Sequence, residues 1–106
     1  MMRNIHFFNL KEGADEASVF DSLDVIIKQY TLERGCVDRR TLRLIDAHEG
    51  GEEVDAPQYM NESWWPDVET AMAAFSQEQQ TPEFSEAVRK MREQIEIVRT
   101  VRYEEI

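Results

Sequence analysis

One histidine of this chain occupies a position suited to acid–base chemistry. His6 lies in the aromatic and β-branched stretch from residue 4 to residue 10, which is typical of a β-strand. The ordinary pKa of an imidazole lies near neutral pH, so His6 is a candidate general base or ligand-orienting group. The alternative is a half-buried histidine whose ring is satisfied by a backbone carbonyl.

Three arginines form a second candidate group. Arg39, Arg40 and Arg43 lie within five positions of an expected strand over residues 36–46, and Arg99 and Arg102 repeat the pattern near the C-terminus. Period-two geometry places Arg39 and Arg43 on one face. If they point into a cavity, they could bind a carboxylate or enolate through forked hydrogen bonds. Alternatively, they protect a sheet edge or pair with the many glutamates.

Aromatic and amide side chains cluster around residues 59–65. In a regular strand Tyr59, Asn61 and Trp65 share one face, and Trp64 lies on the other. One tryptophan should therefore pack under helices, and the other should face a cavity or an interface. The alternative is that both indoles fill a core or an interface.

An acidic loop is the remaining cluster, with members His48, Glu49, Glu52, Glu53 and Asp55. These side chains could bind a divalent ion, but their spacing matches no calcium loop, and two glycines interrupt them. A solvated loop is the favoured interpretation. We expect no metal ion and no cofactor.

Composition excludes several classes of function. The 106 residues suit one domain over 1–106, and 22 acidic against 12 basic residues give a formal net charge of −10. Such a charge repels phosphate backbones and anionic lipid, so we expect neither nucleic-acid nor membrane partners. The single cysteine, Cys36, fits a reducing compartment, and no signal or membrane-spanning stretch is apparent. A cytoplasmic protein is predicted.

The pattern of elements predicts an α+β fold. Strands are expected near residues 4–10, 36–46, 58–64 and 96–105, with helices over about 15–34, after Pro66 and from Thr81. This order is the split β-α-β arrangement of a ferredoxin-like fold, with one four-stranded antiparallel sheet and helices on one face. The first strand is apolar on both faces, so a second copy of the chain should cover the open face. We therefore predict a homodimer.

Three stretches resemble the dimeric α+β barrel superfamily, in particular its stress-responsive A/B-barrel and antibiotic-biosynthesis-monooxygenase-like members. They are "FFNLKEGADE", "ESWWPDVETAMAAF" and "TPEFSEAV". The resemblance implies a cavity in which His6 is a polar residue and in which Asn, Trp and Tyr side chains hold a planar molecule. The histidine that heme-degrading and cyclase-like members carry on the helix corresponding to "TPEFSEAV" is missing here.

Three functions remain open. The first is a dimer that binds a small aromatic or anionic organic molecule in an aromatic-lined cavity. The second is a cofactor-independent oxygenase or cyclase, in which His6 would be the base, Tyr59 and Trp64 would stack on the substrate, and Asn61 or an arginine (Arg39 or Arg43) would stabilise an oxyanion. The third is a structural or regulatory dimer whose cavity is filled by its own side chains.

Overall fold

The computed structural model describes residues 1–76, 78 and 80–106. Its elements, in chain order, are β1 (Met2–Leu10), α1 (Glu16–Asp21), the π-helical segment η1 (Ser22–Ile27), α2 (Lys28–Glu33), β2 (Asp38–Arg43), β3 (His48–Glu49), β4 (Glu52–Glu53), β5 (Tyr59–Trp65), α3 (Val68–Ala74), α4 (Pro82–Gln94) and β6 (Ile95–Glu104). The main sheet has the order β2-β5-β1-β6 with antiparallel neighbours, and β3 and β4 form a separate hairpin. This is the strand order of a ferredoxin-like fold, so the predicted four-stranded antiparallel sheet is confirmed.

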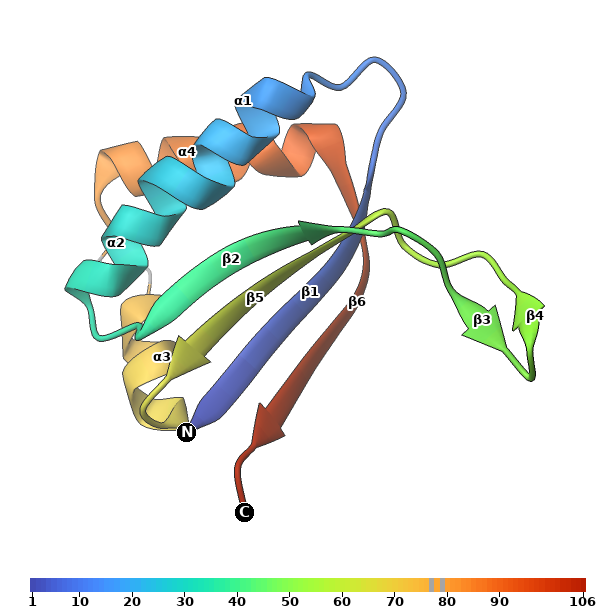
Figure 1. Ribbon diagram of the computed structural model, residues 1–106. Helices are drawn as coiled ribbons and strands as arrows, with labels where there is room; N and C mark the ends of the chain where they lie inside the picture. Colours follow the sequence, from blue (N-terminus) through green and yellow to red (C-terminus); the bar gives the residue numbers. More distant parts are fainter. Residues whose placement is uncertain (77, 79) are drawn as a thin grey trace.

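The helices lie on one side of this sheet. In Figure 1, α1 and α2 continue one another above the strands, α4 runs beside them, and α3 lies by the end where β5 finishes. The opposite face of the sheet carries no element of the described chain. The predicted α+β architecture, with one covered and one open face, is confirmed.

The long first helix begins and ends where its sequence indicates. The Asp15 carboxylate accepts hydrogen bonds from the backbone N–H groups of Ala17 and Ser18, which have no partner inside the helix. Gly35 follows the helix with φ of 100°, a conformation that only glycine adopts cheaply. The middle of the helix departs from the expected α-geometry, because Ser22–Ile27 is π-helical.

The last helix carries the start signal that its sequence predicts. Thr81 is the N-cap and accepts a hydrogen bond from the Phe84 amide, and Pro82 occupies the first turn, where its missing N–H is not needed. The apolar stripe of α4 buries Phe84, Ala87 and Met91 toward the sheet. Pro66, in contrast, lies just before the cap of α3, which is Asp67.

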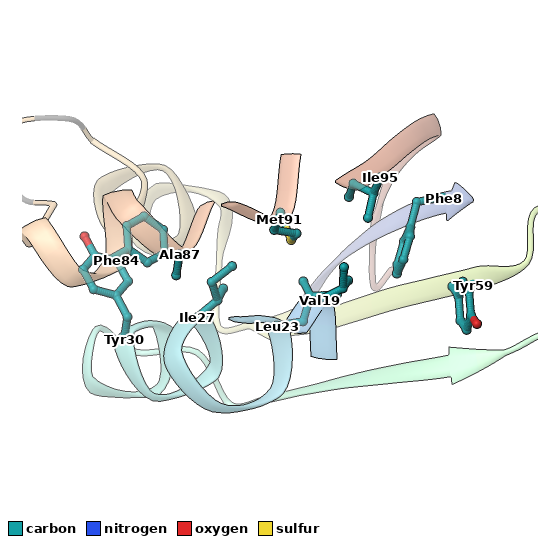
Figure 2. Packing of buried hydrophobic residues seen from close by; sticks show 10 residues of the cluster. All are labelled: Phe8, Val19, Leu23, Ile27, Tyr30, Tyr59, Phe84, Ala87, Met91 and Ile95. Atoms are coloured by element: carbon teal, nitrogen blue, oxygen red, sulfur yellow. The ribbon is translucent and has the colours of Figure 1, made fainter. Parts of the chain in front are cut away.

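Two hydrophobic clusters lie between the helices and the sheet. The larger one joins β1, β5, the first helix and α4, and Figure 2 shows its ten buried members, among them Phe8, Tyr30 and Phe84. The smaller one surrounds Trp65, which is fully buried near α3. Phe75 packs against both clusters, with its ring 5.7 Å from Trp65 and 6.4 Å from Phe84.

No helix in the described ranges is long and apolar enough to cross a membrane.

Candidate functional site

Two neighbouring rows of side chains on the helix-facing side of the sheet are entirely polar. Strand register aligns one row as Thr41, Asn61, His6 and Thr100, and the next as Arg39, Ser63, Asn4 and Arg102. Rows with mainly apolar members flank them: Tyr59, Phe8 and Ile97 beside Arg43 on one side, and Trp65 and Met2 beside Glu104 on the other. The side of a sheet that faces its helices is ordinarily apolar, so eight adjacent polar residues there call for an explanation.

A cavity of about 420 Å³ lies over these rows. The sheet contributes Asn4, His6, Arg39, Asn61 and Arg102 to its lining, and the first helix, α3 and α4 contribute mainly apolar side chains. The volume and the mixture of an apolar wall with a few convergent polar groups are typical of small-molecule sites.

A chain of hydrogen bonds fixes the state of His6. The Nε of Arg102 donates to the Oδ1 of Asn4 at 3.2 Å, so the Asn4 amide nitrogen faces the other way, toward the Nε2 of His6 at 3.1 Å. Because that amide can only donate, Nε2 must accept, and the ring hydrogen is on Nδ1, which lies 2.9 Å from the Oγ1 of Thr100. His6 is therefore a neutral imidazole with both nitrogens bonded to side chains, rather than to a backbone carbonyl.

Electrostatics favour the same neutral state. Burial is the main cause that lowers the pKa of His6, to about 4, and the positive charges of Arg39, Arg102 and Arg92 lower it further. The three guanidinium groups come from β2, β6 and α4, so their charges converge on one ring. At neutral pH His6 does not add positive charge to the cavity.

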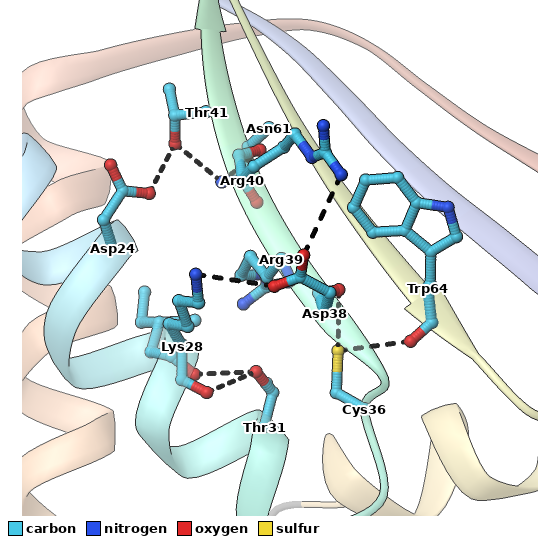
Figure 3. Close-up of polar contacts among 11 residues, drawn as sticks. Asp24, Lys28, Thr31, Cys36, Asp38, Arg39, Arg40, Thr41, Asn61 and Trp64 are labelled. Carbon is cyan, nitrogen blue, oxygen red and sulfur yellow. Dashed lines mark hydrogen bonds and ion pairs between the residues drawn. The ribbon is translucent and has the colours of Figure 1, made fainter.

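Asn61 connects the sheet to the helix above it. Its amide nitrogen donates to the Thr41 hydroxyl at 2.9 Å, and that hydroxyl donates to the Asp24 carboxylate of η1 at 2.8 Å (Figure 3). Asp24 itself lies outside the cavity lining. The Thr41–Asp24 hydrogen bond thus connects η1 to β2, the strand that carries Arg39.

Arg39 is the most unusual member of the site. Its residue surface is only 3% exposed, its Nε has no hydrogen-bond partner, and no ion pair with it occurs among the described residues. Burial lowers the pKa of Arg39 to about 10, so the group remains charged at neutral pH. Its Cζ lies 6.0 Å from the centre of the Phe75 ring.

Trp64 lies on the open face, away from the cavity. It is partly buried, and the guanidinium groups of Arg3 and Arg40 lie over its ring at 5.3 and 4.6 Å. In Figure 3, Arg40 extends from β2 toward this indole. The two tryptophans therefore serve opposite faces, as alternation predicts, and Trp65 is the one under the helices, where its Nε1 donates to the Ser63 hydroxyl.

The structure divides the predicted site residues into two sets. His6, Asn61 and Arg39 line one cavity. Tyr59 and Arg43 lie on the same face of the sheet but both contact the Glu16 carboxylate at the start of α1, outside the cavity. The hypothesis that Tyr59 and Trp64 stack on a substrate next to His6 is thus corrected: Trp64 is separated from His6 by the sheet itself, and the Tyr59 hydroxyl is bonded to Glu16.

Three cavity residues were not among the predicted site residues, although Arg102 was noted in the arginine pattern. Asn4 is two residues before His6, so strand periodicity alone could have placed it on the same face. Arg92 lies on α4, whose apolar stripe gives no hint that a cation lies beside it. Arg102 reaches the cavity only because the pairing of β1 with β6 shifts between Phe7 and Phe8, which leaves Val98 as an extra residue.

The remaining candidates form no site in the part of the chain that the structure describes. Cys36 is buried, its Sγ lies 3.2 Å from the Asp38 carbonyl, and burial raises the pKa of its thiol. His48, Glu49, Glu52 and Glu53 lie on the β3–β4 hairpin, Asp55 follows it, and His48 contacts the Asp46 carboxylate. Nowhere in the described ranges do three histidine, cysteine or acidic side chains gather closely enough to hold a metal ion.

Neither a protein-family profile nor a curated protein matches this sequence. Solved structures do match its fold. At3g17210 from Arabidopsis thaliana superposes with a TM-score of 0.74 at 9% identity, over 100% of this chain and 96% of that chain. SnoaB, a cofactor-independent oxygenase from Streptomyces nogalater, gives 0.69 at 17% identity, over 99% and 92% of the two chains.

A third match is a dimeric protein of unknown function with a ferredoxin-like fold from Bacteroides fragilis. Its TM-score is 0.56 at 14% identity, over 97% of this chain and 94% of that chain. At such identities the likeness establishes the fold alone. The predicted ferredoxin-like fold is confirmed.

Proposed function

We propose that this ferredoxin-like chain binds a small organic molecule in the cavity beneath its helices and acts as a homodimer. The observation that carries the proposal is the conjunction of about 420 Å³ of cavity with five side chains of the two polar rows in its lining. A filled core would place apolar side chains at these positions. This arrangement argues against the third function, in which the protein's own side chains fill the cavity.

A neutral fluorescent probe tests the binding function. N-phenyl-1-naphthylamine should bind wild-type protein saturably, with one site per chain. Val88→Trp, which places an indole in the cavity lining, should weaken binding at least tenfold. Val98→Trp is the matched control, because Val98 is exposed on β6 and does not line the cavity, so it should bind like wild type. Circular dichroism would confirm that both variants fold. Non-saturable binding, or equal binding by both variants, contradicts the proposal.

The open face supports the homodimer. Rows across it combine apolar side chains with charges of both signs: Leu42, Met60 and Phe7 in one row, and Arg40, Glu62, Ile5 and Val101 in the next. A two-fold related copy could cover the apolar groups and oppose unlike charges. The dimeric description of the Bacteroides fragilis protein points the same way.

Sedimentation velocity at micromolar concentration tests this assembly. The wild type should sediment as a dimer and Leu42→Asp as a monomer, because Leu42 is 45% exposed on the open face. Val25→Asp changes a similarly exposed residue on the helical side and should leave the dimer intact. A monomeric wild type would remove the dimer from the proposal.

A second candidate function is cofactor-independent oxygenation in the same cavity. It is favoured by the neutral His6 that lines the cavity, and the fold match to SnoaB agrees with it. A base would take a proton from a ring CH₂ group, and reaction with O₂ would yield C=O and water. To accept that proton, the Nε2 of His6 must release the Asn4 amide, which makes it a weak base in the resting site.

Oxygen uptake with anthrone as a planar probe tests the oxygenase. Wild-type protein should accelerate uptake, and His6→Ala should abolish the acceleration without changing the dimer. Equal rates with and without the protein would leave only the binding function.

A further inference from the structure

The cavity is cationic although the chain is strongly acidic. The chain has 22 acidic and 12 basic residues, yet the described residues that line the cavity include Arg39, Arg92 and Arg102 and no aspartate or glutamate. Acidic side chains are abundant elsewhere in the molecule, so their exclusion from this surface creates a local field opposite in sign to that of the whole protein.

The three arginines differ in what they already bind. Arg102 lies at the exposed rim, and its Nε is used by Asn4. Arg92 is also exposed. Arg39 alone is deeply buried, and its Nε has no acceptor among the described residues. A buried guanidinium without an anion is destabilising, so one anionic group opposite Arg39 would complete the site.

Its neighbours show what kind of anion fits. The negative charge of Asp24 acts on Arg39 from a distance, but the Asp24 carboxylate accepts its hydrogen bond from Thr41 and forms no ion pair with the guanidinium. The remainder of the cavity wall is largely apolar, with the Phe75 ring beside the Arg39 guanidinium and Phe84 and Met91 on α4. One buried cation against an apolar wall matches a molecule with a single negative head group and a hydrophobic body.

We propose that the ligand of this cavity is an organic monocarboxylate with a hydrophobic body, and that Arg39 binds its carboxylate. This inference rests on the proposed binding function and specifies its ligand class. Arg92 and Arg102 attract the anion to the rim, and Arg39 holds it at depth. His6 stays uncharged beside them, and its ring helps to hold Asn4 and Arg102 in place.

A pair of probes that differ only in charge tests the inference. Calorimetric titration would compare 2-naphthoate with 2-naphthamide on the wild type, on Arg39→Met and on Arg99→Met. The wild type should bind the acid at least tenfold more tightly than the amide. Arg39→Met should abolish that preference, because it removes the positive charge that distinguishes the acid from the amide. Arg99→Met, on the open face, should behave like wild type.

A spectroscopic readout separates binding at Arg39 from a general loss of structure. An anion beside Arg39 offsets the positive charges that act on His6, so 2-naphthoate should raise the pKa of His6, followed by NMR of its ring protons, and 2-naphthamide should not. Arg39→Met should remove this ligand-dependent shift.

Each outcome decides between the two proposals. Equal affinity of the wild type for acid and amide, or an acid preference that survives in Arg39→Met, overturns the carboxylate inference and leaves the binding function standing. Binding of N-phenyl-1-naphthylamine without binding of 2-naphthoate has the same meaning. Failure of all three probes overturns both.

Discussion

The two most buried charged side chains of the central sheet lie on opposite faces, and their surroundings differ. Glu62 is 8% exposed on the open face and has Arg3 as a partner at 3.3 Å. Arg39 is 3% exposed on the helix-facing side and has none among the described residues. A paired buried charge is consistent with a structural role, whereas an unpaired one is expected where a ligand supplies the missing charge.

The largest expected contrast between the two faces lies in the adjacent tryptophans. Trp65→Ala should lower the free energy of unfolding by about 3–5 kcal/mol, because it opens a large cavity in a closed cluster. Trp64→Ala should lower it by about 1 kcal/mol or less in dilute protein, because its ring is only partly buried in one chain. Urea unfolding of both variants checks this. Equal losses would mean that the open face belongs to the core of a single chain.

The pH dependence of stability sharpens the description of the helix-facing side. The folded pKa of His6 is depressed to about 4 from an ordinary 6.5, so between these values the unfolded chain binds a proton that the folded chain does not. Stability is therefore lost as pH falls through this window, by about 2 kcal/mol between pH 7.5 and pH 5 from this residue.

His6→Gln isolates this contribution from the many carboxylates. Urea unfolding at pH 7.5 and pH 5 gives the free energy of unfolding at each pH. The decrease in this free energy between the two pH values should be about 2 kcal/mol smaller in the variant than in the wild type. Identical losses in both proteins would indicate that His6 is charged in the folded state.

Removal of the unpaired cation should stabilise the protein. Arg39→Met replaces a buried charge by an apolar side chain of similar volume, and we expect the free energy of unfolding without ligand to rise by about 1–2 kcal/mol. Denaturation by urea at neutral pH measures the change. A loss of stability instead would show that Arg39 already has an anionic partner in the folded chain.

The same substitution on the open face should have the smallest effect and the opposite sign. Arg3→Met removes the partner of Glu62, but the Arg3 side chain is 55% exposed, so its ion pair contributes less than about 1 kcal/mol. Unfolding curves of Arg3→Met and Arg39→Met, measured side by side, compare the two faces directly. If both variants were more stable than the wild type, the two faces would not differ in whether their buried charge is paired.

Much of the fold is encoded locally. The caps at Asp15 and Thr81, the stop at Gly35 and the separation of Trp64 from Trp65 all follow from short-range geometry, and each is present in the structure. The strand order follows from chain connectivity. These features depend on neighbours in sequence, which is why a single sequence suffices to predict them.

The candidate site was only half predictable, because its decisive contacts join distant residues. The hydrogen bond between His6 and Thr100 joins residues far apart in the sequence, and no local pattern predicts it. The same is true of the contacts that Arg43 and Tyr59 make with Glu16. The position of Arg102 depends on β-sheet register, which counting by twos from Ile97 would misplace. The lack of a partner for Arg39 becomes visible only when all its neighbours are known.

The extra residue in β6 has a consequence for how this strand can change by insertion or deletion. In a regular strand, adding or removing one residue moves all later side chains to the opposite face of the sheet. The length of a strand therefore normally determines which side chains each face carries. Val98 lies at the irregular point, between Ile97, opposite Phe8, and Arg99, opposite Phe7. Loss of Val98 would leave Arg102 under the helices and Arg99 outside. At this one position, evolution or engineering can alter the length of the strand while the cavity keeps its charge.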